Sequence, residues 1–129
     1  MDKSKLKYTE THEWVSLEGK IARIGITDHA QKEISDVVFV ELPKPGKQVK
    51  PKESVMVVES VKAAFDIYAP LSGTIIKANE RLTQKPELVN QAPFGDGWLY
   101  EIDCSNTSEF LSLLSEEQYN QAKSSAAHH

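Results

Sequence analysis

The chain has 129 residues, of which 40% are hydrophobic and 26% are charged, and its formal net charge is −4. This length and composition fit one globular domain, so we expect residues 1–129 to fold as a single unit. The negative charge argues against nucleic-acid binding, which needs clustered lysines and arginines.

The lone Cys104 excludes an intramolecular disulfide and favours a reducing compartment. No apolar run approaches the roughly 18 residues of a membrane span. The basic start of the chain leads into polar residues rather than into the apolar core of a signal peptide. These features predict a bacterial cytoplasmic protein, and a mature mitochondrial protein would share them. The terminal His128-His129 pair is either native or a tag remnant, and we assign it no function.

Short strands are indicated along most of the chain. Residues 20–26 alternate in the way a half-buried strand does. The β-branched and aromatic run at 37–42 stops at a Pro-Lys-Pro-Gly segment, because proline cannot donate to a sheet. Four further strands are predicted at 54–59, 65–69, 73–78 and 98–103. Many short strands with proline and glycine between them are typical of a sandwich or a flattened barrel.

Helices are predicted only around this β core. Residues 28–35 form a short helix with Asp28 as N-cap and Gln31 three residues later. Residues 84–90 form one further turn, with Pro86 at a first helical position.

Two short helices are predicted at about 107–123, near the C-terminus. Thr107 or Ser108 caps the first, and a Ser115/Gln118 pair separates it from the second. Three apolar side chains on one face must pack on something, and the β core is the expected partner: Phe110, Leu113 and Leu114.

Lys62 stands among small and apolar neighbours between the strands predicted at 54–59 and 65–69. If these strands pair antiparallel, the five residues between them place Lys62 at an exposed hairpin tip. Small neighbours leave its amine open to a modifying enzyme, although an ordinary solvated lysine fits the same pattern.

The segment VVESVKAAFDIYAP resembles the lipoyl-attachment segment of the glycine cleavage system H-protein family. Four more segments resemble that family in the same order: YTETHEWV, IGITDHAQ, VVFVELPKPG and PFGDGWLYEI. The resemblance implies a mainly β barrel-sandwich hybrid of two antiparallel sheets. It also implies that Lys62 carries lipoic acid in an amide bond, with Glu59 and the flanking Gly46 and Gly73 as further attachment-site residues. The physical use of these glycines would be positive φ or close backbone approach.

The resemblance further implies a carrier that is not itself an enzyme. It would take the methylamine group of glycine from a pyridoxal-phosphate-dependent glycine decarboxylase to a tetrahydrofolate-dependent aminomethyltransferase. Dihydrolipoyl dehydrogenase would reoxidise the arm, and a lipoate ligase or lipoyl transferase would attach it. We expect a monomer without nucleic-acid or membrane partners, docking on basic surfaces of these enzymes.

The resemblance also implies a protecting cleft for the loaded arm. The matching positions are Thr11, Glu13, His29 and Asp66, with both carboxylates accepting from the arm's ammonium and His29 gating the arm. The local pattern alone predicts that Glu13 is a solvated strand residue and that His29 is only a residue of a first helical turn. Phe65 departs from the family pattern, and we expect it to narrow the cleft or pack over the arm.

The sequence also fits other functions. One is a lipoyl domain of a 2-oxoacid dehydrogenase or a biotinyl domain, although the N-terminal and C-terminal segments fit neither. Another is an H-like protein that relays lipoate to other carriers, and a third is a β-sandwich interaction module without a cofactor. A metal or acid/base enzyme would use His12, Glu13 and His29, but the chain has no matching motif and too few histidines, so we expect no metal site.

Overall fold

The protein is described by a computed structural model that covers residues 5–126, with side chains up to residue 123. His128-His129 lie outside this range. In the described part of the chain, no helix is long and apolar enough to span a membrane.

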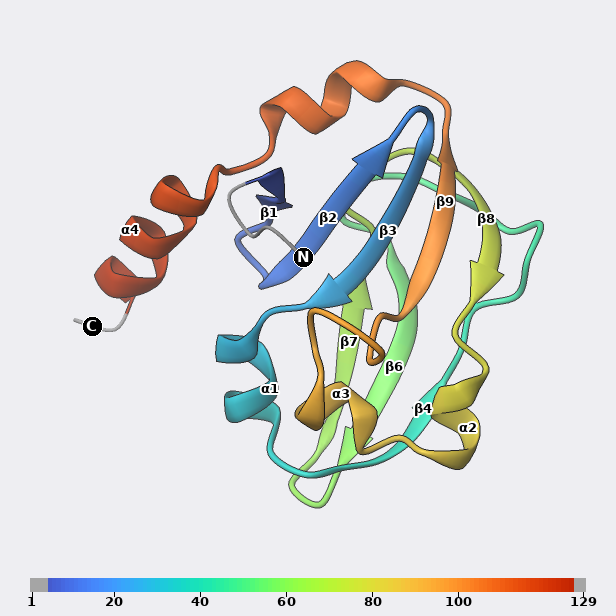
Figure 1. Cartoon of the computed structure of the whole chain (residues 1–129), viewed down its shortest axis with the longest axis vertical. Coiled ribbons are helices and arrows are strands. Elements are labelled where there is room, and N and C mark those ends of the chain that lie inside the picture. The colour runs from blue at the N-terminus through green and yellow to red at the C-terminus, as the bar shows by residue number, and fades with distance from the viewer. Residues whose placement is uncertain (1–4, 127–129) are drawn as a thin grey trace.

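Two antiparallel sheets make up the body of the molecule (Figure 1). The larger sheet has the order β1-β2-β3-β9-β8-β5 and the smaller one the order β4-β6-β7. The larger sheet contains β1 (Lys7–Tyr8), β2 (Glu13–Glu18), β3 (Ile21–Ile26), β5 (Gln48–Val49), β8 (Gly73–Ala78) and β9 (Tyr100–Cys104). The smaller sheet contains β4 (Val37–Glu41), β6 (Ser54–Ser60) and β7 (Ala64–Tyr68). The predicted two-sheet architecture is therefore confirmed. The strands β1, β2 and β5 were not among the six predicted strands, although one interpretation of Glu13 made it a strand residue.

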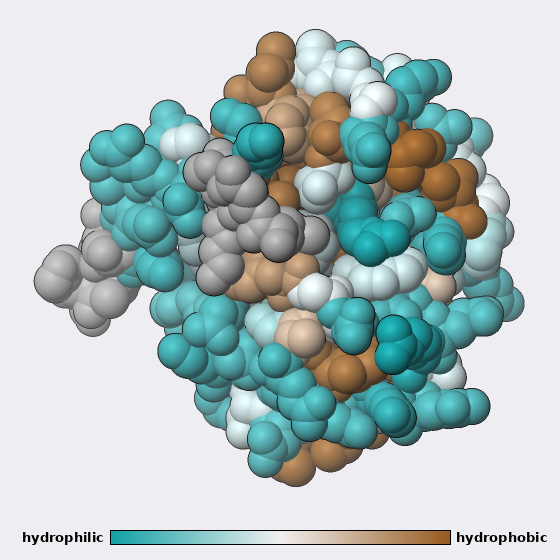
Figure 2. All heavy atoms as spheres, viewed as in Figure 1, coloured by the Kyte–Doolittle hydropathy of each residue, from teal (hydrophilic) through white to brown (hydrophobic). Residues whose placement is uncertain are grey.

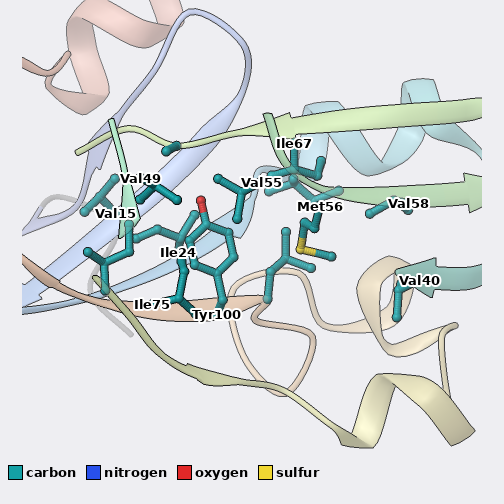
Figure 3. Close-up of a cluster of buried hydrophobic side chains, with 14 of the residues drawn as sticks. Val15, Ile24, Val40, Val49, Val55, Met56, Val58, Ile67, Ile75 and Tyr100 are labelled. Atoms are coloured by element: carbon teal, nitrogen blue, oxygen red, sulfur yellow. The ribbon is translucent and has the colours of Figure 1, made fainter. Parts of the chain in front are cut away.

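The main hydrophobic core combines buried side chains of both sheets (Figure 3). Alternating residues of β3 and β9 meet inward-facing residues of β6 and β7, which explains why period-2 patterning located most of the strands. Ten labelled members of this core are Val15, Ile24, Val40, Val49, Val55, Met56, Val58, Ile67, Ile75 and Tyr100. Cys104 is also buried in it, at 1% exposure.

The helix α1 (Asp28–Ile34) occupies the predicted place, but the cap predicted at Asp28 is wrong. Thr27 is the N-cap, because its backbone is extended and its Oγ1 accepts from the backbone N–H of Ala30 at 3.2 Å. Asp28 is already helical, and its carboxylate accepts from the side chain of Gln31 at 2.9 Å.

Two short helices lie between β8 and β9, α2 (Arg81–Gln84) and α3 (Leu88–Gln91). The turn predicted at 84–90 corresponds to α3, but Pro86 does not open it. Glu87 is the N-cap, and the Pro86 carbonyl accepts from Val89 at 3.1 Å. The helix α2 was not predicted.

The C-terminal region contains a 3-10 helix (Thr107–Ser112) and α4 (Glu116–Ala126). The first begins after Asn106, whose Oδ1 accepts from the Ser108 backbone at 3.1 Å, so the caps predicted at Thr107 or Ser108 are wrong. The Ser115/Gln118 pair that begins α4 is confirmed, since each side chain accepts from the other's backbone N–H.

The apolar residues of this region dock inside the molecule, as expected. Phe110 and Leu113 pack against the main core. Leu114 packs against a second cluster of buried aromatic and aliphatic side chains, formed by Leu6, Tyr8, Trp14 and Tyr119. Backbone hydrogen bonds of 2.8 and 2.9 Å between Tyr8 and Leu114 join the two ends of the described chain.

Candidate functional site

Lys62 lies at the exposed tip of the hairpin that β6 and β7 form (Figure 1). The register pairs Glu59 with Ala64, and the Ser60 N–H donates to the Ala63 carbonyl at 2.9 Å. The Lys62 Nζ donates to the backbone carbonyl of Glu33 in α1 at 3.4 Å. The predicted hairpin and the exposure of its lysine are both present in the structure.

The hydroxyl of Ser60 closes this turn. Its Oγ accepts from the backbone N–H groups of Lys62, at 3.0 Å, and Ala63, at 3.2 Å. A side chain that satisfies two turn N–H groups replaces the Asn-Gly or Asp-Gly pair that the sequence lacks here. Ser60 was not among the residues predicted from sequence. A hydroxyl two residues before the lysine, the spacing of a serine turn, was the signal that could have found it.

Apolar side chains are exposed near the hairpin tip. Val61 is 68% exposed, and Val38 and Phe39 of the neighbouring strand β4 are each 54% exposed. In Figure 2 apolar atoms gather at the lower end of the molecule, where Figure 1 shows the hairpin tip. The lysine therefore stands beside a surface that an apolar partner surface could cover.

Residues Phe65 and Asp66 point to opposite faces of β7, because successive side chains of a strand alternate. Phe65 is half-buried and packs against the main core. Asp66 is exposed and accepts from the Ser54 hydroxyl at 3.0 Å. Phe65 was expected to narrow the cleft or pack over the arm; in the structure it packs on the interior of the sandwich, on the face of β7 opposite to Asp66.

Glu13 is a buried carboxyl group, with 1% exposure, so the solvated reading of this residue is wrong. Its Oε1 accepts from the hydroxyls of Thr9 and Thr11, and its Oε2 accepts from the Tyr68 backbone at 3.4 Å. Burial raises the Glu13 pKa above its usual range, and these hydrogen bonds oppose that shift.

Glu13 and Thr11 line a pocket of about 660 Å³ between the start of the chain, the end of β7 and the C-terminal region. Other lining residues are Tyr8, Tyr68, Glu109 and Leu114. Glu13 therefore presents a buried acceptor to a hollow large enough for a small amine and part of an acyl chain.

His29 is not among the residues that line the Glu13 pocket. It lies next to His12, in the loop before β2, and next to Glu33 of α1. The His29 Nε2 lies 3.0 Å from Glu33 Oε1, and its ring centroid lies 4.7 Å from that of His12. Glu33 is also the residue whose carbonyl accepts from Lys62. The structure thus places Thr11 with Glu13, places His29 near the lysine, and places Asp66 on the outer face of β7.

Gly46 and Gly73 each have a conformational reason, and the two reasons differ. Gly46 has a φ of +97°, with open space around a hypothetical Cβ. A Cβ on Gly73 would lie 2.2 Å from the Asp103 carbonyl oxygen and 2.5 Å from a methyl of Ile102, both in the paired strand β9. Both predicted uses of glycine are confirmed. Gly73 begins β8 of the six-stranded sheet, and Gly46 lies in the loop before β5, where its N–H donates to the Ile75 carbonyl of β8 at 2.7 Å. Neither glycine lies in the sheet that carries Lys62.

Comparison with known proteins gives this arrangement its context. The family model described as "Glycine cleavage H-protein" matches residues 6–126. The chain belongs to the glycine cleavage H-protein family. Members of this family are similar to it over most of its length. The glycine cleavage system H protein of Thermotoga maritima is 53% identical over 115 residues, which are 89% of this chain and 93% of that protein.

A probable glycine cleavage system H protein of Aeropyrum pernix is 54% identical over 114 residues, 88% of this chain and 80% of the relative. The crystal structure of a glycine cleavage system H protein from Mycobacterium marinum superposes with a TM-score of 0.85 at 33% identity. That alignment covers 94% of this chain and 98% of the other. Sequence and structure thus agree on an H-protein fold, and the resemblance inferred from five segments is confirmed.

Proposed function

We propose that this H-protein family member carries lipoic acid on Lys62 and acts as the shuttle of a glycine cleavage system. In this role it takes the methylamine group of glycine from a pyridoxal-phosphate-dependent glycine decarboxylase to an aminomethyltransferase that uses tetrahydrofolate. Dihydrolipoyl dehydrogenase reoxidises it. The supporting observation is an exposed lysine at a hairpin tip whose following neighbours, Ala63 and Ala64, are small and exposed.

The surroundings of Lys62 fit an acylated lysine. Its side chain extends from the tip, where a lipoate ligase or lipoyl transferase has access, and the turn is held by the Ser60 hydroxyl rather than by the lysine itself. Acylation removes the ammonium charge of Lys62. The interaction that this disturbs is the long hydrogen bond, of 3.4 Å, from the Lys62 Nζ to the Glu33 carbonyl. When bound, lipoate supplies a dithiolane that accepts the aminomethyl group on sulfur and cycles between disulfide and dithiol.

The pocket beside Glu13 is proposed to hold the charged end of the loaded arm. From Ala64 to Tyr68, β7 spans about 14 Å at a rise of about 3.4 Å per residue, a length comparable to a lipoyl-lysine side chain. The buried Glu13 carboxylate would hold an ammonium in its charged form, with Thr11 supplying a hydroxyl. A pocket with few water molecules would slow hydrolysis of the aminomethyl group.

Asp66 and His29 are proposed to act on the way to this pocket. Asp66 lies on the outer face of β7 between the tip and Tyr68, so its carboxylate attracts a cationic arm end along the strand. A series of contacts connects the tip with the pocket on the α1 side: Lys62 to Glu33, Glu33 to His29, and His29 to His12, the chain neighbour of Thr11 and Glu13. His29 therefore stands where it can gate the arm.

The partner enzymes are proposed to dock around the hairpin tip. The exposed Val38, Phe39 and Val61 offer an apolar centre, and the net charge of −4 favours basic partner surfaces. We further propose that residues 1–129 act as one carrier domain, as a monomer, in the cytoplasm. The cytoplasmic location is supported by relatives with the same family name in bacteria and archaea.

Intact-mass spectrometry after co-expression with a lipoate ligase tests the attachment. We expect one lipoyl adduct, which Lys62→Arg abolishes and Lys47→Arg, at another exposed lysine, leaves in place. No adduct on the wild-type chain, or an adduct that survives Lys62→Arg, contradicts the proposal. The lipoylated protein is then expected to support CO₂ release from glycine by the glycine decarboxylase. A lipoylated chain that fails there but passes lipoate to other carriers would indicate the relay function instead.

A further inference from the structure

A group of potential metal ligands lies between α1 and the loop that connects β1 to β2. His12, His29 and Glu33 each offer one ligand atom, and these atoms all lie within 4.8 Å of one another. Both histidines are half-buried and Glu33 is exposed. Three nitrogen and oxygen ligands at such spacing, open to solvent on one side, resemble a metal site with a vacant fourth position.

The fold fixes the position of each ligand. His29 and Glu33 are four residues apart in α1, so they project from the same face of the helix. His12 comes from the loop between β1 and β2, on a backbone with a φ of +73°, a region that a residue other than glycine rarely adopts. This conformation brings the His12 ring to 4.7 Å from the His29 ring.

A second layer of contacts orients His12. Its Nδ1 lies 2.8 Å from Tyr119 Oη, and that oxygen lies 2.8 Å from Thr27 Oγ1. If His12 Nδ1–H donates to Tyr119, the tautomer is fixed and Nε2 keeps its lone pair for an ion. Histidine ligands in metal sites usually donate their other ring N–H to such a partner, which makes Tyr119 a positioning residue.

We propose that His12, His29 and Glu33 bind a divalent transition-metal ion of the Zn²⁺ class. Two imidazoles and a carboxylate suit Zn²⁺ better than Mg²⁺ or Ca²⁺, which prefer oxygen ligands. Water fills the fourth position, because Glu33 leaves the site exposed. The sequence analysis predicted no metal site because the chain has few histidines. It did not consider Glu33, which lies beside His29 in α1.

Metal binding would also affect the proposed carrier, without depending on it. An ion that holds His29 withdraws its ring from the arm, and it ties α1 to the loop before Glu13. The Lys62 Nζ already contacts the Glu33 carbonyl. The site would therefore make the surroundings of the hairpin tip responsive to available Zn²⁺.

Calorimetric titration of the full chain with Zn²⁺ at pH 7.5 tests the proposal. His128 and His129 are first replaced by alanine, because terminal histidines bind transition metals on their own. We expect one ion per chain. Loss of an outer-shell partner costs roughly 10- to 100-fold in metal affinity, and we expect a loss of that size for Tyr119→Phe. Loss of a ligand should weaken binding more, so we expect a larger effect for Glu33→Ala, His29→Ala and His12→Asn. Asparagine is chosen at position 12 because it tolerates positive φ.

Lys32→Ala is the matched control, since it removes another i,i+4 ion pair of α1, with Asp28 at 3.1 Å, and is not one of the proposed ligands. It should bind Zn²⁺ as tightly as the parent. Melting curves with and without Zn²⁺ check each fold, and Zn²⁺ should raise the melting temperature of the parent but not of Glu33→Ala. No binding by the parent, or equal binding by the parent and Glu33→Ala, overturns the proposal.

Discussion

The substitution Gly73→Ala separates a role in folding from a role in cofactor attachment. The added Cβ would lie 2.2 Å from the backbone oxygen of Asp103 and 2.5 Å from Ile102 in the paired strand. A backbone oxygen of a hydrogen-bonded strand cannot turn aside as the end of a flexible side chain can. We therefore expect the upper part of the range for overpacking, about 3 kcal/mol of unfolding free energy.

That loss translates into a measurable change in melting temperature. With about 2.1 cal/mol/K of unfolding entropy per residue, a chain of 129 residues has about 0.27 kcal/mol/K. The melting temperature of Gly73→Ala should thus fall by about 11 °C. Gly46→Ala serves as the comparison, because it has open space and only a φ of +97° to strain it. We expect about 1 kcal/mol, or about 4 °C, for that variant.

Circular-dichroism melts measure both shifts, and lipoylation by a ligase is measured at a temperature where both variants are folded. We expect lipoylation rates equal to wild type, since Gly73 lies in the sheet that does not carry Lys62 and Gly46 lies in the loop before β5 of that same sheet. A Gly73→Ala melting temperature within about 3 °C of wild type would refute the packing argument. Slow lipoylation of a fully folded variant would show that the glycines serve the lysine directly.

Three further predictions concern Glu13, Ser60 and the surface charge. Because burial raises the Glu13 pKa, the native state binds more protons than the unfolded chain above the ordinary pKa of 4.5. The free energy of unfolding should then decline as pH rises through the Glu13 pKa. Urea titrations at several pH values should show a weaker decline for Glu13→Gln than for wild type. The same pH dependence in both proteins would contradict the reasoning. Ser60→Ala removes the hydroxyl that holds the turn, which should cost about 1 kcal/mol of turn stability. The KM of the ligase for this variant should therefore rise about fivefold, with kcat unchanged. Salt should raise the KM of the partner enzymes for the lipoylated carrier, and a KM independent of ionic strength would remove the electrostatic part of docking.

The sequence predicted the β core well because its signals are local. Alternation at residues 20–26 and the β-branched run at 37–42 each correspond to an observed strand. The two-residue strands β1 and β5 were missed, since a pair of residues carries no period and their pairing depends on distant partners. Cap residues were misplaced by one position because neighbouring hydroxyl and carboxyl side chains offer equally good local signals.

The site was only partly predictable for a related reason. Lys62 and its hairpin could be read from the chain, but the burial of Glu13 depends on residues brought together by the fold. The inward direction of Phe65 follows from the strand register, which pairs it with the fully buried Val58. The neighbourhood of His12, His29 and Glu33 requires the docking of α1 against a loop far away in sequence.

The pocket beside Glu13 has a wall made by the last part of the protein to be synthesised, including Glu109, Leu113 and Leu114. The three-stranded sheet, with its modifiable lysine, is complete once residue 68 has been made. A nascent or C-terminally clipped polypeptide could thus be lipoylated before the pocket that protects the aminomethyl group is complete. Removing residues from 107 onward should leave attachment intact while shortening the lifetime of the loaded form.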